Sequence, residues 1–68
     1  MKAKLIIRKN TSNKSGANYL SGAIKIGDYG KFDYYFPSAT NVLALTGMSM
    51  QELQEIPVGV IYQNEFEV

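Results

Sequence analysis

The chain has 68 residues, of which 46% are hydrophobic and 19% charged, and its formal net charge is +1 at pH 7. This length allows one domain, residues 1–68, and the composition is globular rather than disordered. Cysteine and histidine are both absent, which excludes disulfides and the commonest zinc ligands and removes two of the usual catalytic nucleophiles and bases.

A core of this size rarely supplies more than about 3–5 kcal/mol, so small domains often add disulfides, a metal or self-association. Because the first two lack their residue types here, the sequence predicts a homodimer or higher homo-oligomer. No apolar run approaches the ~20 residues that cross a bilayer, and no signal-peptide pattern follows the first lysines. We therefore expect a cytoplasmic protein.

The charges are unevenly distributed along the chain. All seven basic residues lie within residues 1–31, together with one acid, Asp28, whereas residues 32–68 hold five acids and no base. Such asymmetry indicates either an anionic partner or two oppositely charged surfaces that keep the protein dissolved.

The first half of the chain predicts three strands. Residues 2–9 alternate, with Ala3, Leu5 and Ile7 on one face and basic side chains on the other, which is typical of a half-buried strand. A polar loop follows, and then a second strand over 19–26, in which Gly22 indicates a bulge or bend. Residues 27–30 are typical of a hairpin connection.

The third predicted strand covers residues 31–36 and ends at Pro37. Its alternation places Phe32, Tyr34 and Phe36 on one face, which we assign to the core, and Tyr35 on the other face, toward solvent.

The second half predicts a helical connection and a closing strand. Residues 42–45 fit either a helical turn or a short strand. Ser49 and Glu52 have the spacing of a capping box, and Pro57 ends the helix that begins there. A final strand is predicted over 58–68. The order β-β-β-α-β, with a fifth strand if 42–45 is extended, predicts a mostly β fold, a small OB-like partly open barrel. The alternative is an antiparallel sheet with one packed helix.

Nothing in the sequence indicates catalysis. The carboxylates are scattered, and neither of the common glycine-rich phosphate-binding motifs is present. We therefore expect no enzyme activity, no cofactor and no metal site.

The distribution of aromatic residues points to binding instead. Six of the eight aromatic residues fall between positions 19 and 36, interleaved with lysines. Single-stranded nucleic acid is bound by a positive groove with aromatic side chains on which the bases stack. The residues predicted to bind are Arg8, Lys9, Lys14, Tyr19, Lys25, Tyr29, Lys31 and Tyr35.

Residues 11–19, Thr-Ser-Asn-Lys-Ser-Gly-Ala-Asn-Tyr, resemble a loop of the small single-stranded DNA-binding proteins of filamentous bacteriophages, the helix-destabilising proteins. The resemblance extends over about the first 36 residues. It implies an OB-type barrel that coats single-stranded DNA as a dimer, with Lys14 and Tyr19 on the strand; Tyr29 and Lys31 correspond only loosely. The chain departs from that family in its acidic second half and in lacking a late dimerisation hairpin.

The sequence thus predicts a phage- or plasmid-encoded protein of the cytoplasm that binds single-stranded DNA, or RNA, without sequence specificity and supports replication or recombination. The alternative is a small protein-interaction module, such as a phage-encoded inhibitor or accessory subunit. Its basic face would meet an acidic protein partner, or one of its strand edges would extend a partner's sheet.

Overall fold

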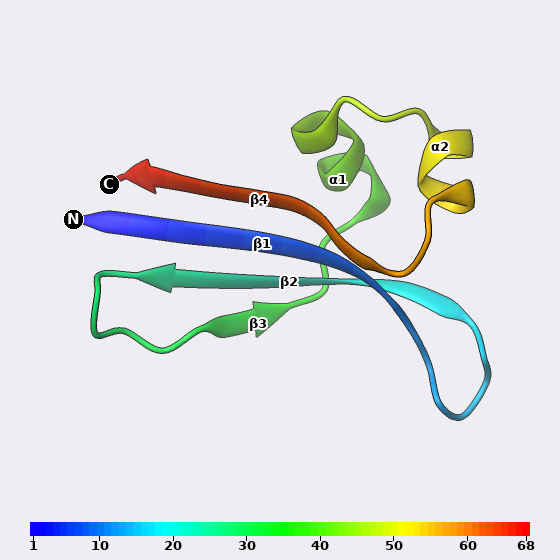
Figure 1. Cartoon of the computed structure of the whole chain (residues 1–68), viewed down its shortest axis with the longest axis horizontal. Helices are drawn as coiled ribbons and strands as arrows, with labels where there is room; N and C mark the ends of the chain where they lie inside the picture. Colours follow the sequence, from blue (N-terminus) through cyan, green and yellow to red (C-terminus); the bar gives the residue numbers. More distant parts are fainter.

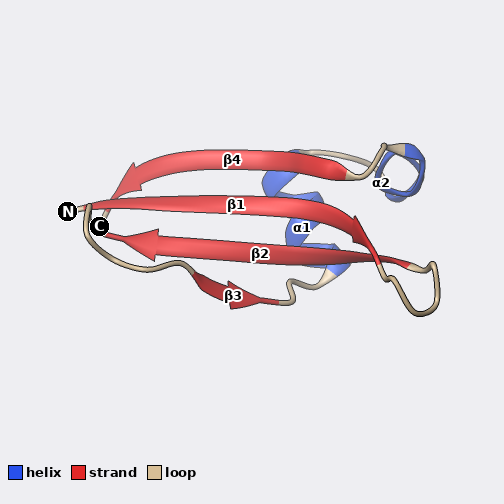
Figure 2. Ribbon diagram, turned by 60° about the horizontal axis from the view of Figure 1, so that its bottom comes forward, coloured by secondary structure: helices blue, strands red, loops and turns tan.

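The computed structural model describes all of residues 1–68, which form an antiparallel four-stranded sheet with two short helices on one face (Figures 1 and 2). The strands are β1 (Lys2–Thr11), β2 (Asn18–Ile26), β3 (Asp33–Tyr35) and β4 (Gly59–Glu67), and the helices are α1 (Ala39–Thr46) and α2 (Met50–Glu55). The spatial order of the strands is β3-β2-β1-β4, so the two helices carry the chain from one edge of the sheet to the other.

The predicted mostly β fold is confirmed, as is the order of a three-strand meander, a helical connection and a closing strand. The sheet is open, because β3 and β4 are its two edges and do not pair with each other. The arrangement therefore corresponds to the antiparallel sheet with packed helix, with two helices in place of one. The segment 42–45, which the sequence left between helix and strand, lies within α1.

Short polar motifs set the ends of both helices. The Ser38 side chain accepts a hydrogen bond from the Asn41 amide at the start of α1, and Gly47 ends that helix with a φ of 72°, a left-handed conformation that favours glycine. At the start of α2, Ser49 and Glu52 form the predicted capping box. These caps allow two helices of only eight and six residues to form beside the sheet.

The core lies between the helices and one face of the sheet, which we call the covered face. Ile7 from the middle of β1 and Val42 from α1 are fully buried, and Leu53 from α2 completes the central cluster. Ala3 is also buried, so the predicted inward face of β1 is confirmed. This core is small, as expected for the chain length.

Lys9 is buried on the covered face and joins α2 to β1. Its side chain is only 5% exposed, and Nζ donates hydrogen bonds to the carbonyl oxygens of Leu53, Gln54 and Ile56 at 2.9, 2.8 and 2.8 Å. Carbonyls at the end of a helix lack intrahelical partners and carry a partial negative charge. The ammonium group therefore caps the C-terminal end of α2.

The pairing of β3 with β2 determines which aromatic side chains face the helices. Tyr35 lies opposite Gly22 and Tyr34 opposite Ala23. A Cβ at position 22 would lie 2.5 Å from the Tyr35 ring, so the ring occupies space on the covered face that exists only because residue 22 is glycine. The predicted faces of β3 are therefore wrong: Tyr35 lies on the covered face, and Tyr34 lies on the opposite one.

Candidate nucleic-acid interface

The face of the sheet opposite the helices, which we call the open face, has no element packed against it (Figure 2). Side chains alternate between the two faces along each strand, and the register aligns them between strands, so the residues of the open face can be read from the pairing. This set comprises Lys2, Lys4, Ile6, Arg8 and Asn10 from β1, Tyr19, Ser21, Ala23 and Lys25 from β2, Tyr34 from β3, and Val60, Gln63, Glu65 and Glu67 from β4. The open face thus combines basic, aromatic and small polar side chains, with two glutamates of β4 opposite Lys2 and Lys4.

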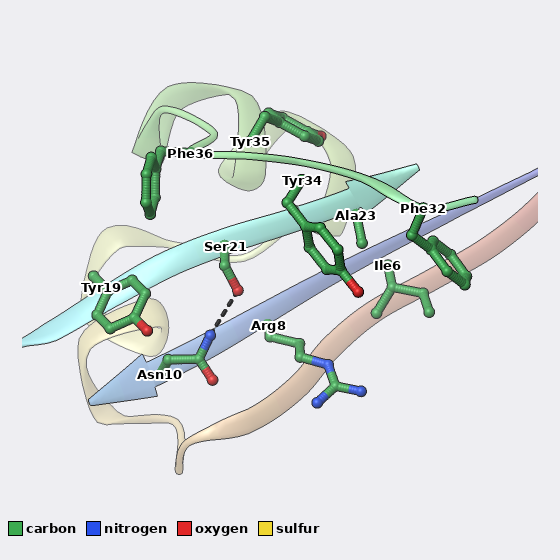
Figure 3. A pocket seen from close by; sticks show the side chains of 11 residues that line it. Ile6, Arg8, Asn10, Tyr19, Ser21, Ala23, Phe32, Tyr34, Tyr35 and Phe36 are labelled. Carbon is green, nitrogen blue, oxygen red and sulfur yellow. Dashed lines mark hydrogen bonds between the residues drawn. The ribbon is translucent and has the colours of Figure 1, made fainter. Parts of the chain in front are cut away.

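A groove of about 570 Å³ runs over this face (Figure 3). Small side chains, Ser21 and Ala23, line its middle, and Asn10 donates a hydrogen bond of 2.6 Å from Nδ2 to Ser21 Oγ. Larger side chains stand around them. The full lining is Ile6, Arg8, Asn10, Tyr19, Ser21, Gly22, Ala23, Phe32, Tyr34, Tyr35 and Phe36.

Aromatic rings border the groove and are unusually accessible. Tyr34 is 79% exposed and Phe36 82%, and Tyr19 is 42% exposed. Tyr19 and Phe36 contact each other edge to face, with ring centroids 6.3 Å apart. Contiguous patches of exposed apolar side chains commonly mark interaction sites. These rings therefore offer flat faces to a ligand.

Two cations lie among these rings. Lys25 Nζ lies 5.4 Å from the centroid of the Phe32 ring, within cation–π range. Arg8 is exposed, and its register neighbours on the open face are Ser21 and Val60, neither of which is charged. An anion that enters the groove therefore meets the Arg8 guanidinium without a competing carboxylate across the adjacent strands.

Other charges on the open face are balanced in pairs. β4 returns the acidic end of the chain to the basic first strand, so that Glu65 lies opposite Lys4 and Glu67 opposite Lys2. Glu67 also accepts a 3.1 Å hydrogen bond from the N-terminal amino group. The uneven charge of the sequence is thus partly neutralised at one end of the sheet, and the unbalanced positive charge lies toward the aromatic groove.

The structure brings three of the predicted binding residues together and separates the others. Arg8, Tyr19 and Lys25 share the open face. Lys14 lies in the loop between β1 and β2, next to the Tyr19 end of the groove. Tyr29 and Lys31 lie in the loop between β2 and β3, at the opposite end of β2.

Tyr29 is fully solvent-exposed and lies apart from the groove. It borders a different hollow, near the chain termini, that is also lined by Asp28 and Glu67. Its two carboxylates offset the charges of Lys2 and the N-terminal amino group, which lie in the same lining, so this hollow has no excess of positive charge to attract a phosphate.

Two predicted binding residues lie on a different face from the one that the sequence predicted. Lys9 is buried beneath α2 with its ammonium bound to three carbonyls, so it is not presented to a ligand on the open face. Tyr35 has its ring on the covered face over Gly22. The assignment of Tyr34 and Phe36 to the core is also wrong, since both are largely exposed.

The sequence contained signals for these corrections. Lys9 follows Ala3, Leu5 and Ile7 at the same two-residue spacing, so strict alternation already places it on the covered face. Ser21 and Ala23 are small residues that alternate between Tyr19 and Lys25, a pattern that leaves a hollow between larger side chains.

No protein-family model matches the chain, and neither does any curated protein or solved structure. The resemblance of residues 11–19 to phage DNA-binding proteins therefore stays a prediction. Among the helices, none is long and apolar enough to cross a membrane. The open face is therefore the feature of this chain that bears on its function.

Proposed function

We propose that the chain binds single-stranded nucleic acid across the open face of its sheet, with the bases on the aromatic rings and the phosphates toward Arg8, Lys25 and Lys14. One observation carries the proposal: exposed aromatic rings and an unbalanced arginine lie together around a groove on a sheet face that nothing covers. Binding of this kind would serve replication or recombination of phage or plasmid DNA.

The rings favour single strands over duplex. Stacking on an aromatic side chain contributes about 1–3 kcal/mol per base, and it requires a base whose face is free. In a duplex the base faces are already occupied by their neighbours. Because every base has such a face, little sequence preference follows from stacking alone.

The cations determine how binding responds to salt. Each phosphate contact to a single strand contributes about −0.7 to the slope of log affinity against log salt concentration. Three contacts, from Arg8, Lys25 and Lys14, predict a slope of about −2. With a net charge of only +1, we expect stacking to add to the affinity that these phosphate contacts give.

A titration of fluorescently labelled oligo-dT, followed by anisotropy at several salt concentrations, tests this function. We expect saturable binding that weakens with a salt slope of about −2 and exceeds the binding of a duplex of equal length. Equal binding of duplex and single strand would contradict the stacking surface. Absence of binding at low salt would overturn the proposal and favour a protein partner for the open face.

A further inference from the structure

We infer that two copies of the chain associate along the free edge of β4, pairing antiparallel to form one continuous eight-stranded sheet. β4 runs over nine residues, Gly59–Glu67, and pairs only with β1. Its other edge has no partner within the chain. The opposite edge of the sheet, β3, is only three residues long, so β4 is the edge with length enough to add a strand.

The β4 edge lacks most of the features that keep edge strands apart. Proteins commonly protect long edges with lysine, proline or a bulge. β4 contains no lysine or proline, and its two charged residues, Glu65 and Glu67, lie opposite Lys4 and Lys2 of β1. Its one irregularity lies where Ile7 pairs with Tyr62 and Arg8 with Val60. The stretch 62–67 beyond it is regular. Phe66 on this stretch is an exposed aromatic residue.

The direction of the backbone groups fixes which residues would pair. The Val68 amide donates to the Met1 carbonyl of the β1 side at 2.9 Å. Because these groups alternate along an antiparallel strand, residues 62, 64 and 66 turn their amides and carbonyls toward β1. Gln63, Glu65 and Glu67 therefore turn theirs to the free edge, where a second strand would meet them.

Charge and side-chain matching select one register. With Asn64 opposite the same residue of the second copy, Gln63 lies opposite Glu65 and Tyr62 opposite Phe66. The Tyr62–Phe66 pair is a non-hydrogen-bonded pair, in which side chains approach most closely, and aromatic cross-strand pairs are stabilising. This pairing would cover the exposed Phe66 ring.

Neighbouring registers are less favourable. Centring the pair on residue 65 places Glu65 opposite itself, and centring it on residue 66 places Glu65 opposite Glu67; like charges directly opposite are destabilising. Centring on residue 63 brings Phe66 opposite Val60. These two side chains lie on different faces, since Val60 pairs with Arg8 on the open face and Phe66 with Ala3 on the covered face. They therefore could not contact each other in this register.

The association would place the open faces of the two copies side by side. The two-fold axis that relates two identical antiparallel neighbours is perpendicular to the sheet, so both open faces lie on the same side and all four helices on the other. The dimer would therefore present two aromatic grooves on one continuous surface. The pairing itself does not depend on the proposed function; only this use of it does.

A cysteine scan tests the interface in a chain that has no cysteine of its own. Single variants Gln63→Cys, Asn64→Cys and Glu65→Cys are oxidised under the same mild conditions and analysed on non-reducing gels. Directly opposed residues of a non-hydrogen-bonded pair have Cα atoms about 4.5 Å apart, within the range that a disulfide spans. Asn64→Cys should cross-link most completely, and preferential cross-linking at 63 or 65 would overturn the register.

Sedimentation equilibrium of the unmodified chain and two variants tests the association itself, without nucleic acid. The unmodified chain should reach twice its monomer mass as concentration rises. Glu65→Pro removes an edge-facing donor but no bond to β1, and the two lost intermolecular bonds should raise the dimer Kd at least about tenfold. Glu65→Ala, which removes the same charge and keeps the donor, should still dimerise. A chain that stays monomeric at every concentration would overturn the inference, whatever its affinity for oligo-dT.

Discussion

Replacing Lys9 with methionine will destabilise the fold by about 2–4 kcal/mol, although the substitution keeps a long, unbranched side chain. A hydrogen bond from a charged donor contributes about 1.5–3 kcal/mol, and Lys9 makes three of them to the end of α2. Part of this is offset because methionine avoids the cost of burying an ammonium group. Since the core of a domain of this size rarely supplies more than about 3–5 kcal/mol, much of the variant population should be unfolded.

Urea unfolding followed by circular dichroism measures this effect, with Lys14→Met as the matched control. Lys14 is exposed in the loop between β1 and β2, so its replacement should change the free energy of unfolding by less than about 0.5 kcal/mol. Comparing the two variants separates a buried lysine that holds a helix from an exposed loop lysine, which the sequence did not distinguish. Equal stability of the Lys9 and Lys14 variants would show that the ammonium does not hold α2 in place.

Replacing Phe36 or Tyr34 with alanine will weaken oligo-dT binding by about 1–3 kcal/mol each, or roughly 5- to 150-fold in Kd. Both rings are largely exposed beside the groove, so under the proposed function each would stack on a base. Because exposed side chains contribute little packing, the free energy of unfolding should change by less than about 1 kcal/mol. Binding and stability are therefore expected to separate in these variants.

Tyr29→Ala is the control for the aromatic variants. It removes the same kind of exposed ring, but from the loop between β2 and β3, beside Asp28 and Glu67. Its affinity should stay within about twofold of the original chain, a change of about 0.4 kcal/mol. A loss at Tyr29 as large as that at Phe36 would move the binding surface away from the open face.

The parts of the fold that the sequence predicted correctly are those with several agreeing local signals. The alternation of β1 extends over Ala3, Leu5 and Ile7, and the structure buries Ala3 and Ile7. The capping box of α2 depends on only two residues, Ser49 and Glu52, but its spacing has a direct hydrogen-bond meaning. Predictions from a pattern repeated over a long strand, or from a specific polar motif, therefore hold in the folded chain.

The face of β3 could not be predicted from its own pattern. A shift of one residue in a strand exchanges its two faces, and β3 has only three residues to set its register. The deciding feature is on the neighbouring strand, where Gly22 leaves room for the Tyr35 ring. Hydrophobicity alone instead assigned Phe32, Tyr34 and Phe36 to the core.

Predicting the residues of the candidate site likewise required knowing which segments distant in the sequence lie side by side. The sequence identified Arg8, Tyr19 and Lys25, which come from long strands whose faces follow from alternation. It assigned the two most exposed rings bordering the groove to the core, because Tyr34 lies in the short strand β3 and Phe36 directly follows it. It also counted Lys9 as a surface cation, since a buried lysine is uncommon and becomes favourable only when acceptors from a distant helix surround it.

Chemical-shift mapping of the isotope-labelled protein with unlabelled oligo-dT tests the central claim most directly, because it locates the bound strand without any mutation. We predict that the largest shifts fall on Arg8, Ser21, Ala23, Tyr34 and Phe36 around the groove, and that α1 and α2 change little. Shifts concentrated on the helices or on the loop that holds Tyr29, with the groove unchanged, would contradict the account.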